Sequence, residues 1–293
     1  MNIVRRVAVE LSIEDPNGDA ILLALYNFPG LFLVNSKVLE THFPIGTVMA
    51  IREPWMKIAS ASSHRNAMIR VDSPSDVIIL EPSHPILRGV KWGTTPTIYR
   101  HTFNTVERWK EQGNKHFKDA LFVPAAFAWS RGLESDPSLH ALYLNRSQAY
   151  IKLGWFSAAL ADAAHVLSAP ELHISTAKKA AYRAASAEYG LGRYRDALAR
   201  LEKLDEDVHI KSLKSRCRQR TQEATTGEYA WIDMLRAGQH AVPHLDVAEF
   251  VDPAVGVAAM STRGGGRGIQ SMRDIKTGEL LVSCHVTIYL HTN

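Results

Sequence analysis

Five polar side chains at fixed spacing are the residues of this chain best suited to binding chemistry. Lys110 and Asn114 are four residues apart, Asn145 follows later, and Lys179 and Arg183 are again four residues apart. Residues four apart on an α-helix share a face. Lysine and arginine supply cations, arginine can hold a carboxylate bidentately, and asparagine amides donate without adding charge. The set therefore predicts a groove that grips the acidic end of a peptide.

Three similar segments carry these residues, at about 106–139, 140–173 and 178–211. An offset of 34 residues superposes the first two: Trp109 falls on Tyr143, His116 on Tyr150, Ala120 on Gly154, Phe122 on Phe156 and Ala125 on Ala159. The third copy begins four residues late, which predicts a longer loop around Pro170. A repeat of this length with alternating large, small and aromatic positions resembles the tetratricopeptide repeat. The alternative is a generic helical bundle.

The resemblance covers roughly residues 104–206 and implies stacked helix pairs with a concave binding face. The first helix of each repeat would line that face. The five polar residues match the two-carboxylate clamp of chaperone-binding tetratricopeptide domains, once the four-residue insertion is allowed. In that family the groove holds the terminal Glu-Glu-Val-Asp of cytosolic heat-shock chaperones. The resemblance thus implies a protein partner with an acidic C-terminus. The alternative is that these are ordinary solvent-exposed helix residues.

Composition restricts the remaining classes of protein. The chain has 293 residues, 46% of them hydrophobic and 22% charged, and a formal net charge of +4. These values are typical of a globular protein of two or three domains and do not by themselves indicate nucleic-acid binding. Cys217 and Cys284 form no disulfide framework or zinc cluster. The most apolar stretch, 21–34, contains Pro29 and Gly30 and is too short to span a bilayer. We therefore expect cytoplasmic and/or nuclear localisation and no membrane association.

The N-terminal segment, 1–98, predicts a small β-rich domain. An Asn-Gly turn at Asn17 and Gly18 separates two apolar runs, and further short strands follow between turn-forming residues. Such strands predict an antiparallel barrel or sandwich, and an OB-like barrel would raise nucleic-acid binding as a hypothesis. The segment lacks the row of aromatic and basic residues that single-strand binders use. A structural or docking domain is therefore the favoured interpretation.

The segment 99–241 is predicted to hold the repeats and capping helices. A basic run at 211–220, KSLKSRCRQR, follows the third repeat. It could contact phosphate or an acidic surface. The favoured interpretation is a solvated helix that caps the repeat array, because repeat arrays need polar ends for solubility.

The last segment, 242–293, predicts short strands joined by a glycine turn and a polar turn. Its core, GGGRGIQSMRDIKTGELL, resembles the opening of a SET domain, the fold of protein lysine methyltransferases. In that family a Gly-x-Gly element lies against S-adenosylmethionine, and here Gly266, Arg267 and Gly268 match it. Glycine lets the backbone approach a cofactor closely. The alternative is an ordinary hairpin with a glycine loop.

The Asn-His pair, cysteine and catalytic tyrosine of a complete SET domain do not follow in this sequence. We therefore expect no catalytic residues, no cofactor and no metal in this chain, and no methyl transfer by it. The sequence also has no P-loop, Gly-x-Ser-x-Gly or His-Glu-x-x-His motif.

The sequence as a whole predicts a multidomain α+β protein: a small β-rich domain, an all-α tetratricopeptide solenoid and a β fragment resembling the start of a SET domain. Two functions of different class remain open. The chain is either a peptide-binding scaffold in the front part of a lysine methyltransferase-like protein, or a non-enzymatic tetratricopeptide co-chaperone or adaptor. Nucleic-acid binding by the N-terminal domain is a third, weaker hypothesis.

Overall fold

A computed structural model of the protein describes residues 8–26, 39–40, 42–58, 67–73, 76–80, 84–93, 105–238, 246–259 and 267–284. The chain divides into two compact units, Met1–Ala187 and Glu188–Asn293, and each is described by itself. The domain borders predicted after residues 98 and 241 both lie outside the described residues.

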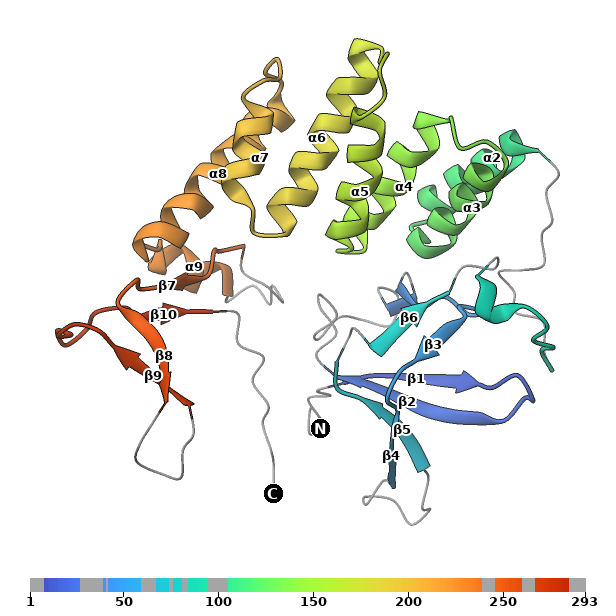
Figure 1. Ribbon diagram of the computed structural model, residues 1–293, viewed down its shortest axis with the longest axis horizontal. Coiled ribbons are helices and arrows are strands. Elements are labelled where there is room, and N and C mark those ends of the chain that lie inside the picture. Colours follow the sequence, from blue (N-terminus) through green and yellow to red (C-terminus); the bar gives the residue numbers. More distant parts are fainter. Residues whose placement is uncertain are drawn as a thin grey trace. The chain divides into compact units, whose positions relative to one another are not determined.

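The first unit begins with two small β-sheets (Figure 1). The larger sheet has the strand order β1-β2-β5-β4 and the smaller sheet pairs β3 with β6. The strands are β1 (Ala8–Glu14), β2 (Ala20–Tyr26), β3 (Met49–Ile51), β4 (Trp55–Ile58), β5 (Ala67–Val71) and β6 (Val77–Ile79), and a short 3₁₀ helix, η2, spans Pro85–Leu87. Alternate residues of the larger sheet form one core with residues of the smaller one: Val9, Leu23, Leu25 and Val71 are buried against Met49, Ile51, Val77 and Ile79.

The predicted hairpin at the Asn-Gly turn is confirmed, because β1 and β2 pair antiparallel on either side of it. Gly18 has φ +97° there, which favours glycine, and the Asp15 carboxylate accepts the backbone N–H of Asn17 and Asp19. The expectation of a wholly antiparallel barrel is wrong, since β2 and β5 are parallel. The pairing joins strands distant in the sequence, which turn signals between neighbouring runs do not reveal.

Five helices follow in the order that the repeats predict: α2 (Val106–Lys118), α3 (Phe122–Ser135), α4 (His140–Lys152), α5 (Phe156–Leu167) and α6 (Ile174–Gly190), whose last residues belong to the second unit. The helices α2 and α3 form one packed pair and α4 and α5 the next (Figure 1). Thr105 caps α2, its hydroxyl accepting the backbone N–H of Arg108.

The four-residue insertion of the third repeat lies inside α6. The helices α2, α4 and α6 begin at residues 106, 140 and 174, at the regular period of 34. The first two have 13 residues each, whereas α6 has 17. The prediction that the loop around Pro170 takes up the insertion is therefore incomplete: the insertion adds about one helical turn, roughly 6 Å, before Lys179.

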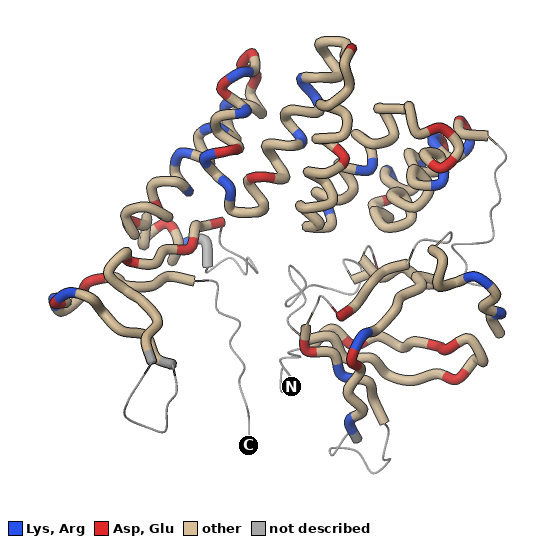
Figure 2. Tube along the Cα trace, in the orientation of Figure 1, with Lys and Arg blue, Asp and Glu red and all other residues tan. Residues whose placement is uncertain are grey.

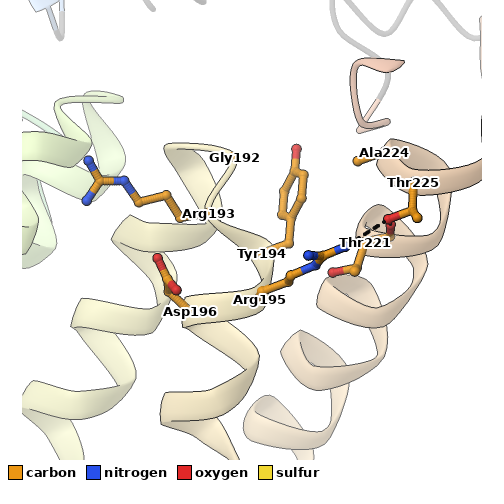
Figure 3. A pocket seen from close by; sticks show the side chains of 8 residues that line it. All are labelled: Gly192, Arg193, Tyr194, Arg195, Asp196, Thr221, Ala224 and Thr225. Atoms are coloured by element: carbon orange, nitrogen blue, oxygen red, sulfur yellow. Dashed lines mark hydrogen bonds between the residues drawn. The ribbon is translucent and has the colours of Figure 1, made fainter. Parts of the chain in front are cut away.

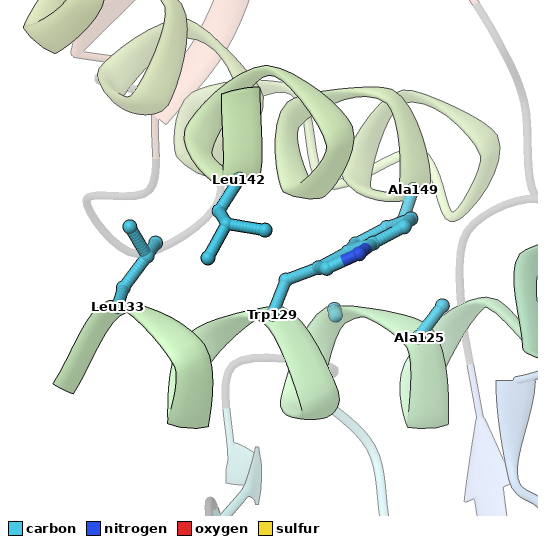
Figure 4. Close-up of a cluster of buried hydrophobic side chains, with 6 residues drawn as sticks. Ala125, Trp129, Leu133, Leu142 and Ala149 are labelled. Atoms are coloured by element: carbon cyan, nitrogen blue, oxygen red, sulfur yellow. The ribbon is translucent and has the colours of Figure 1, made fainter. Parts of the chain in front are cut away.

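The first two repeats share a core built on Trp129 of α3 (Figure 4). The Trp129 side chain is 2% exposed and packs with Leu142 and Ala149 of α4. Gly113 of α2 lies directly against its indole, and Gly132 lies against Leu142. The small residues of the repeat pattern thus allow close helix approach, as the sequence predicts.

Ala120 occupies a backbone conformation that the other repeats assign to glycine. It has φ +59°, and the equivalent residues Gly154 and Gly192 both have φ +73°. A side chain in this region costs free energy because its Cβ crowds the backbone. We expect Ala120→Gly to raise the free energy of unfolding by about 0.5–1 kcal/mol in a urea titration. Gly154→Ala should lower it by a similar amount, and a loss of stability in Ala120→Gly would contradict the assignment.

The second unit contains the rest of the helices and the C-terminal strands. They are α7 (Tyr194–Leu201), α8 (Val208–Thr226), α9 (Trp231–Gly238), β7 (Phe250–Val251), β8 (Val255–Ala259), β9 (Arg267–Ser271) and β10 (Val282–Ser283). β8 pairs with β9 and β7 with β10, both antiparallel. Asp207 caps the start of α8, its carboxylate accepting two backbone N–H groups, and Gly227 caps the end with φ +69°.

The basic run of α8 is engaged within the unit rather than left open to a ligand. Lysines and arginines lie along this helix in Figure 2. Four of them pair with acids: Lys214 with Glu206, Arg216 with Asp246, Arg218 with Glu202 and Arg220 with Glu223. Since Lys214 and Arg220 are also buried, the prediction of a solvated helix is wrong at these residues, and the pairing leaves fewer cations for phosphate.

The same helix holds the segment that leads into the C-terminal strands. The Glu223 carboxylate accepts the backbone N–H of Ala248 at 3.0 Å, and the Tyr229 hydroxyl donates to the Ala248 carbonyl at 2.7 Å. Asp246 accepts from Arg216 and from the Tyr189 hydroxyl. These contacts join 246–251 to α8, so the C-terminal strands begin as part of the cap of the helical array. Within the described residues, no helix combines the length and apolarity that crossing a bilayer requires.

Candidate functional site

The predicted peptide groove draws its side chains from α2, α4 and α6, and all five lie in the first unit. Lys110 and Lys179 are exposed, whereas Asn114, Asn145 and Arg183 are half-buried. Exposed ammonium groups remain free to reach a ligand, and half-buried amides and guanidinium groups are held by their surroundings. The set thus combines two exposed cations with three half-buried donors.

Asn114 and Asn145 are in direct contact, although 31 positions separate them in the sequence. The Nδ2 atom of Asn145 donates to the Oδ1 atom of Asn114 at 3.3 Å. This orientation of the amides follows from their hydrogen bonding. The bond leaves the two N–H donors of Asn114 Nδ2 and the second N–H of Asn145 unused by this contact. α2 and α4 therefore present their asparagines side by side, as the repeat register predicts.

Hydrophobic packing brings α6 against the second repeat at the neighbouring positions. Leu144 of α4, Val166 of α5 and Ala180 of α6 form one buried cluster. Leu144 precedes Asn145 and Ala180 follows Lys179, so the core positions and the predicted groove positions adjoin in both helices. The apolar cluster thereby fixes the helices that carry the polar set.

Arg183 is the member of the set with the most unusual environment. It is partly withdrawn from solvent, and burial lowers the pKa of its guanidinium to about 10. Its Nη1 atom is buried and has no hydrogen-bond partner in the described part of the chain. Even so, the group stays charged at neutral pH. A buried cation without an acceptor is a place where a ligand carboxylate would be strongly favoured.

The predicted cofactor residues are only partly within the described chain. Gly266 lies outside it, and Arg267 and Gly268 stand in β9, where Gly268 pairs with Ala258 of β8. Around them the described residues form an open two-stranded hairpin, with Val257 72% exposed and Ile269 74% exposed. An exposed two-stranded sheet of this kind does not enclose a nucleoside-containing cofactor such as S-adenosylmethionine within the described residues.

A hollow of about 340 Å³ lies between the start of α7 and the end of α8 (Figure 3). Its walls carry Arg193, Arg195, Asp196 and the hydroxyls of Thr221 and Thr225. Arg195 donates to Thr225 at 3.3 Å, and the hollow is open to solvent. No sequence motif marks this hollow, because its residues come from two separate helices. In the described ranges, no three His, Cys, Asp or Glu residues are arranged to hold a metal ion.

Comparison with known proteins finds several relatives of parts of this chain. A Gibberella zeae protein named "Methyltransferase" is 27% identical over 95% of this chain and 37% of its own length. RNA polymerase II-associated protein 3 of Rattus norvegicus is 29% identical over 50% of this chain and 20% of its own. Tetratricopeptide repeat protein 12 of Mus musculus is 32% identical over 41% of this chain and 16% of its own. The chain thus spans little more than a third of the first relative and a fifth or less of the others.

Among solved structures, the first tetratricopeptide domain of Spaghetti (RPAP3), bound to the HSP90 peptide SRMEEVD, is 24% identical over 39% of this chain and 91% of its own length, with a TM-score of 0.36. The Arabidopsis OM64 tetratricopeptide domain is 24% identical over 39% of this chain and 93% of its own length, with a TM-score of 0.35. No family model matches the chain.

The helical region is tetratricopeptide-like, on the strength of its 34-residue period, its paired helices and its sequence relatives. The described residues also form β-strands before and after the helical region. The SET character of the C-terminal segment remains a prediction.

Proposed function

We propose that this chain is a scaffold that binds the acidic C-terminus of a partner protein, of the heat-shock chaperone type, in a groove lined by α2, α4 and α6. Arg183 carries the proposal. Its Nη1 atom is buried and has no hydrogen-bond partner among the described residues, and such an atom is costly to maintain unless a ligand supplies the missing acceptor. Lys110, Asn114, Asn145 and Lys179 add donors on the same helices.

The chemistry requires two carboxylates. One is the main-chain carboxylate of the peptide's last residue, and the other is an acidic side chain near it. Lys110 and the paired asparagines would hold one, whereas Lys179 and Arg183 would hold the other. The contacts are charge-assisted and partly desolvated, so each should contribute more than a neutral surface hydrogen bond.

The sequence relatives support the class of partner. One of them is RNA polymerase II-associated protein 3. A repeat domain of RPAP3 is bound to the HSP90 peptide SRMEEVD and another to the HSP70 peptide SGPTIEEVD, both of which end in Glu-Glu-Val-Asp. The same ligand chemistry is the one that the five side chains of this chain would accept.

A free-acid peptide ending in Glu-Glu-Val-Asp is expected to bind with micromolar affinity, about −8 kcal/mol. Lys110→Ala and Arg183→Ala should each weaken binding by about 1.5–3 kcal/mol, because each removes a hydrogen bond to a charged group. Amidating the peptide's C-terminus should cost a similar amount. Isothermal titration of the 293-residue chain measures all of these quantities, and affinity should fall with added salt.

Lys115→Ala is the matched control, because Lys115 is an exposed lysine of α2 that directly follows Asn114 and therefore points to a different face of the helix. It should change the affinity by less than about 0.5 kcal/mol. Equal affinities for the free-acid and amidated peptides would contradict the proposed carboxylate binding. Unchanged peptide affinity in a Lys110→Ala/Arg183→Ala double variant would contradict it as well.

A second candidate is that the chain is the front part of a lysine methyltransferase-like protein, whose partner the repeats recruit. The observation that favours it is the similarity of 95% of the chain to the Gibberella zeae protein named "Methyltransferase". The repeats would then bring a partner to an enzyme, whereas in the first proposal they act as an adaptor. Cytoplasmic and/or nuclear localisation is part of both proposals.

A further inference from the structure

Arg183 differs from three other arginines of the helices that are partly or fully withdrawn from solvent. Arg146 pairs with Asp162 at 2.7 Å, Arg200 with Glu188 at 2.6 Å and Arg220 with Glu223 at 2.6 Å. In each of these pairs a carboxylate of the chain itself balances the charge. For Arg183, by contrast, no acid of the described residues is within ion-pairing distance, and its Nη1 atom is buried without an acceptor.

A charged group lowers the stability of the folded state when one of its nitrogen atoms is buried without an acceptor, because that atom loses water and gains no hydrogen bond. The lowered pKa of Arg183 agrees with this reading, since desolvation is its cause. A neutral side chain of similar length would avoid the loss. The helix itself would not suffer, because methionine and arginine have similar helix propensities.

We propose that Arg183 keeps the empty groove less stable than a neutral residue would, so that a bound carboxylate is what stabilises α6. The inference rests on the proposed function, because the ligand supplies the missing acceptor. Ligand that binds only the folded state adds stability by mass action. The site would thereby link occupancy by an acidic peptide to the order of the third repeat.

Lys179 provides the contrast within the same helix. It lies four residues before Arg183 on the same face, but its side chain is exposed. An exposed ammonium group keeps its hydration in the folded chain, so removing it does not stabilise the fold by relieving desolvation. Its removal should therefore weaken peptide binding without stabilising the empty chain, whereas removal of Arg183 should do both.

The test uses the 293-residue chain, its Arg183→Met variant and its Lys179→Met variant, with and without a free-acid peptide ending in Glu-Glu-Val-Asp. Thermal unfolding followed by circular dichroism gives the Tm, and hydrogen exchange gives the protection of 174–187. Without peptide, Arg183→Met should raise the Tm by about 2–5 °C and increase the protection, whereas Lys179→Met should change neither. Peptide affinity should fall roughly tenfold to 100-fold in Arg183→Met.

At one fixed peptide concentration, the Tm of the unsubstituted chain should rise more than that of Arg183→Met, because the variant binds more weakly. An equal or lower Tm for Arg183→Met, with its helical circular dichroism retained, would overturn the inference. So would an equal rise in Lys179→Met, because the effect would then come from net charge alone. If Arg183→Met is more stable but no peptide shifts the unsubstituted chain, then the ligand-linked inference and the proposed function fail together. If peptide binds but Arg183→Met is not stabilised, only the inference fails.

Discussion

Gly113→Ala is expected to lower the free energy of unfolding of the helical repeats by about 2–3 kcal/mol, even though alanine is the better helix former. An added Cβ at this position would overlap the indole of Trp129 and would lie 2.6 Å from its Cδ1 atom. Trp129 is 2% exposed and its ring also packs on Phe117, with ring centroids 5.9 Å apart. The indole therefore has no open space into which it could move.

The size and sign of this loss distinguish packing from helix propensity. Glycine to alanine within a helix normally stabilises by about 0.5–1 kcal/mol, so a net loss means that overpacking exceeds that gain. Gly256→Ala in strand β8 controls only for the added methyl group, because nothing lies within 4 Å of its added Cβ. Urea unfolding measures both variants. Combining Gly113→Ala with Trp129→Phe should recover part of the loss, and a stabilised Gly113→Ala would show that α2 and α3 do not approach this closely.

The repeat pattern predicted the helices because a 34-residue period constrains several positions at once. The small residues at Gly113 and Ala125 predicted close helix approach, and the register placed Asn114 and Asn145 on neighbouring helices. The Asn-Gly turn likewise predicted the β1–β2 hairpin. In each case the signal is local or periodic, so the order of residues suffices to read it.

Other features depend on tertiary contacts that no local pattern carries. Four inserted residues with Pro170 nearby indicate a longer connection, but a period cannot tell a longer loop from a longer helix, and α6 takes a further turn. The parallel β2–β5 pair joins strands distant in sequence. The sequence shows that Arg183 is charged, but the burial of its side chain depends on the tertiary packing around α6. Likewise, the sequence does not reveal whether the basic run of α8 binds a ligand, because its partners Glu206, Asp246 and Glu223 are identified only by tertiary contacts.

Arg146→Met is expected to destabilise the first two repeats by about 3–5 kcal/mol, because it leaves the Asp162 carboxylate buried without its partner. The Arg146 guanidinium donates to both Asp162 oxygens, at 2.8 and 2.7 Å, and to the Ser130 hydroxyl at 2.8 Å. The Asp162 side chain is only 8% exposed. One ion pair thus bonds α3, α4 and α5 together, and its three hydrogen bonds satisfy most of the guanidinium.

A double-variant cycle separates the pair from the general cost of altering a helix. Asp162→Leu in the background of Arg146→Met removes the stranded carboxylate, so the double variant should be more stable than the sum of the single losses predicts, by on the order of 2 kcal/mol. Arg131→Met is the matched control, because Arg131 pairs with Glu134 at 2.7 Å on the surface of α3 and should lose less than about 1 kcal/mol. Urea unfolding of the four chains measures the coupling. Strictly additive losses would mean that Arg146 and Asp162 stabilise the array independently, and the ion pair would then be a contact without energetic coupling.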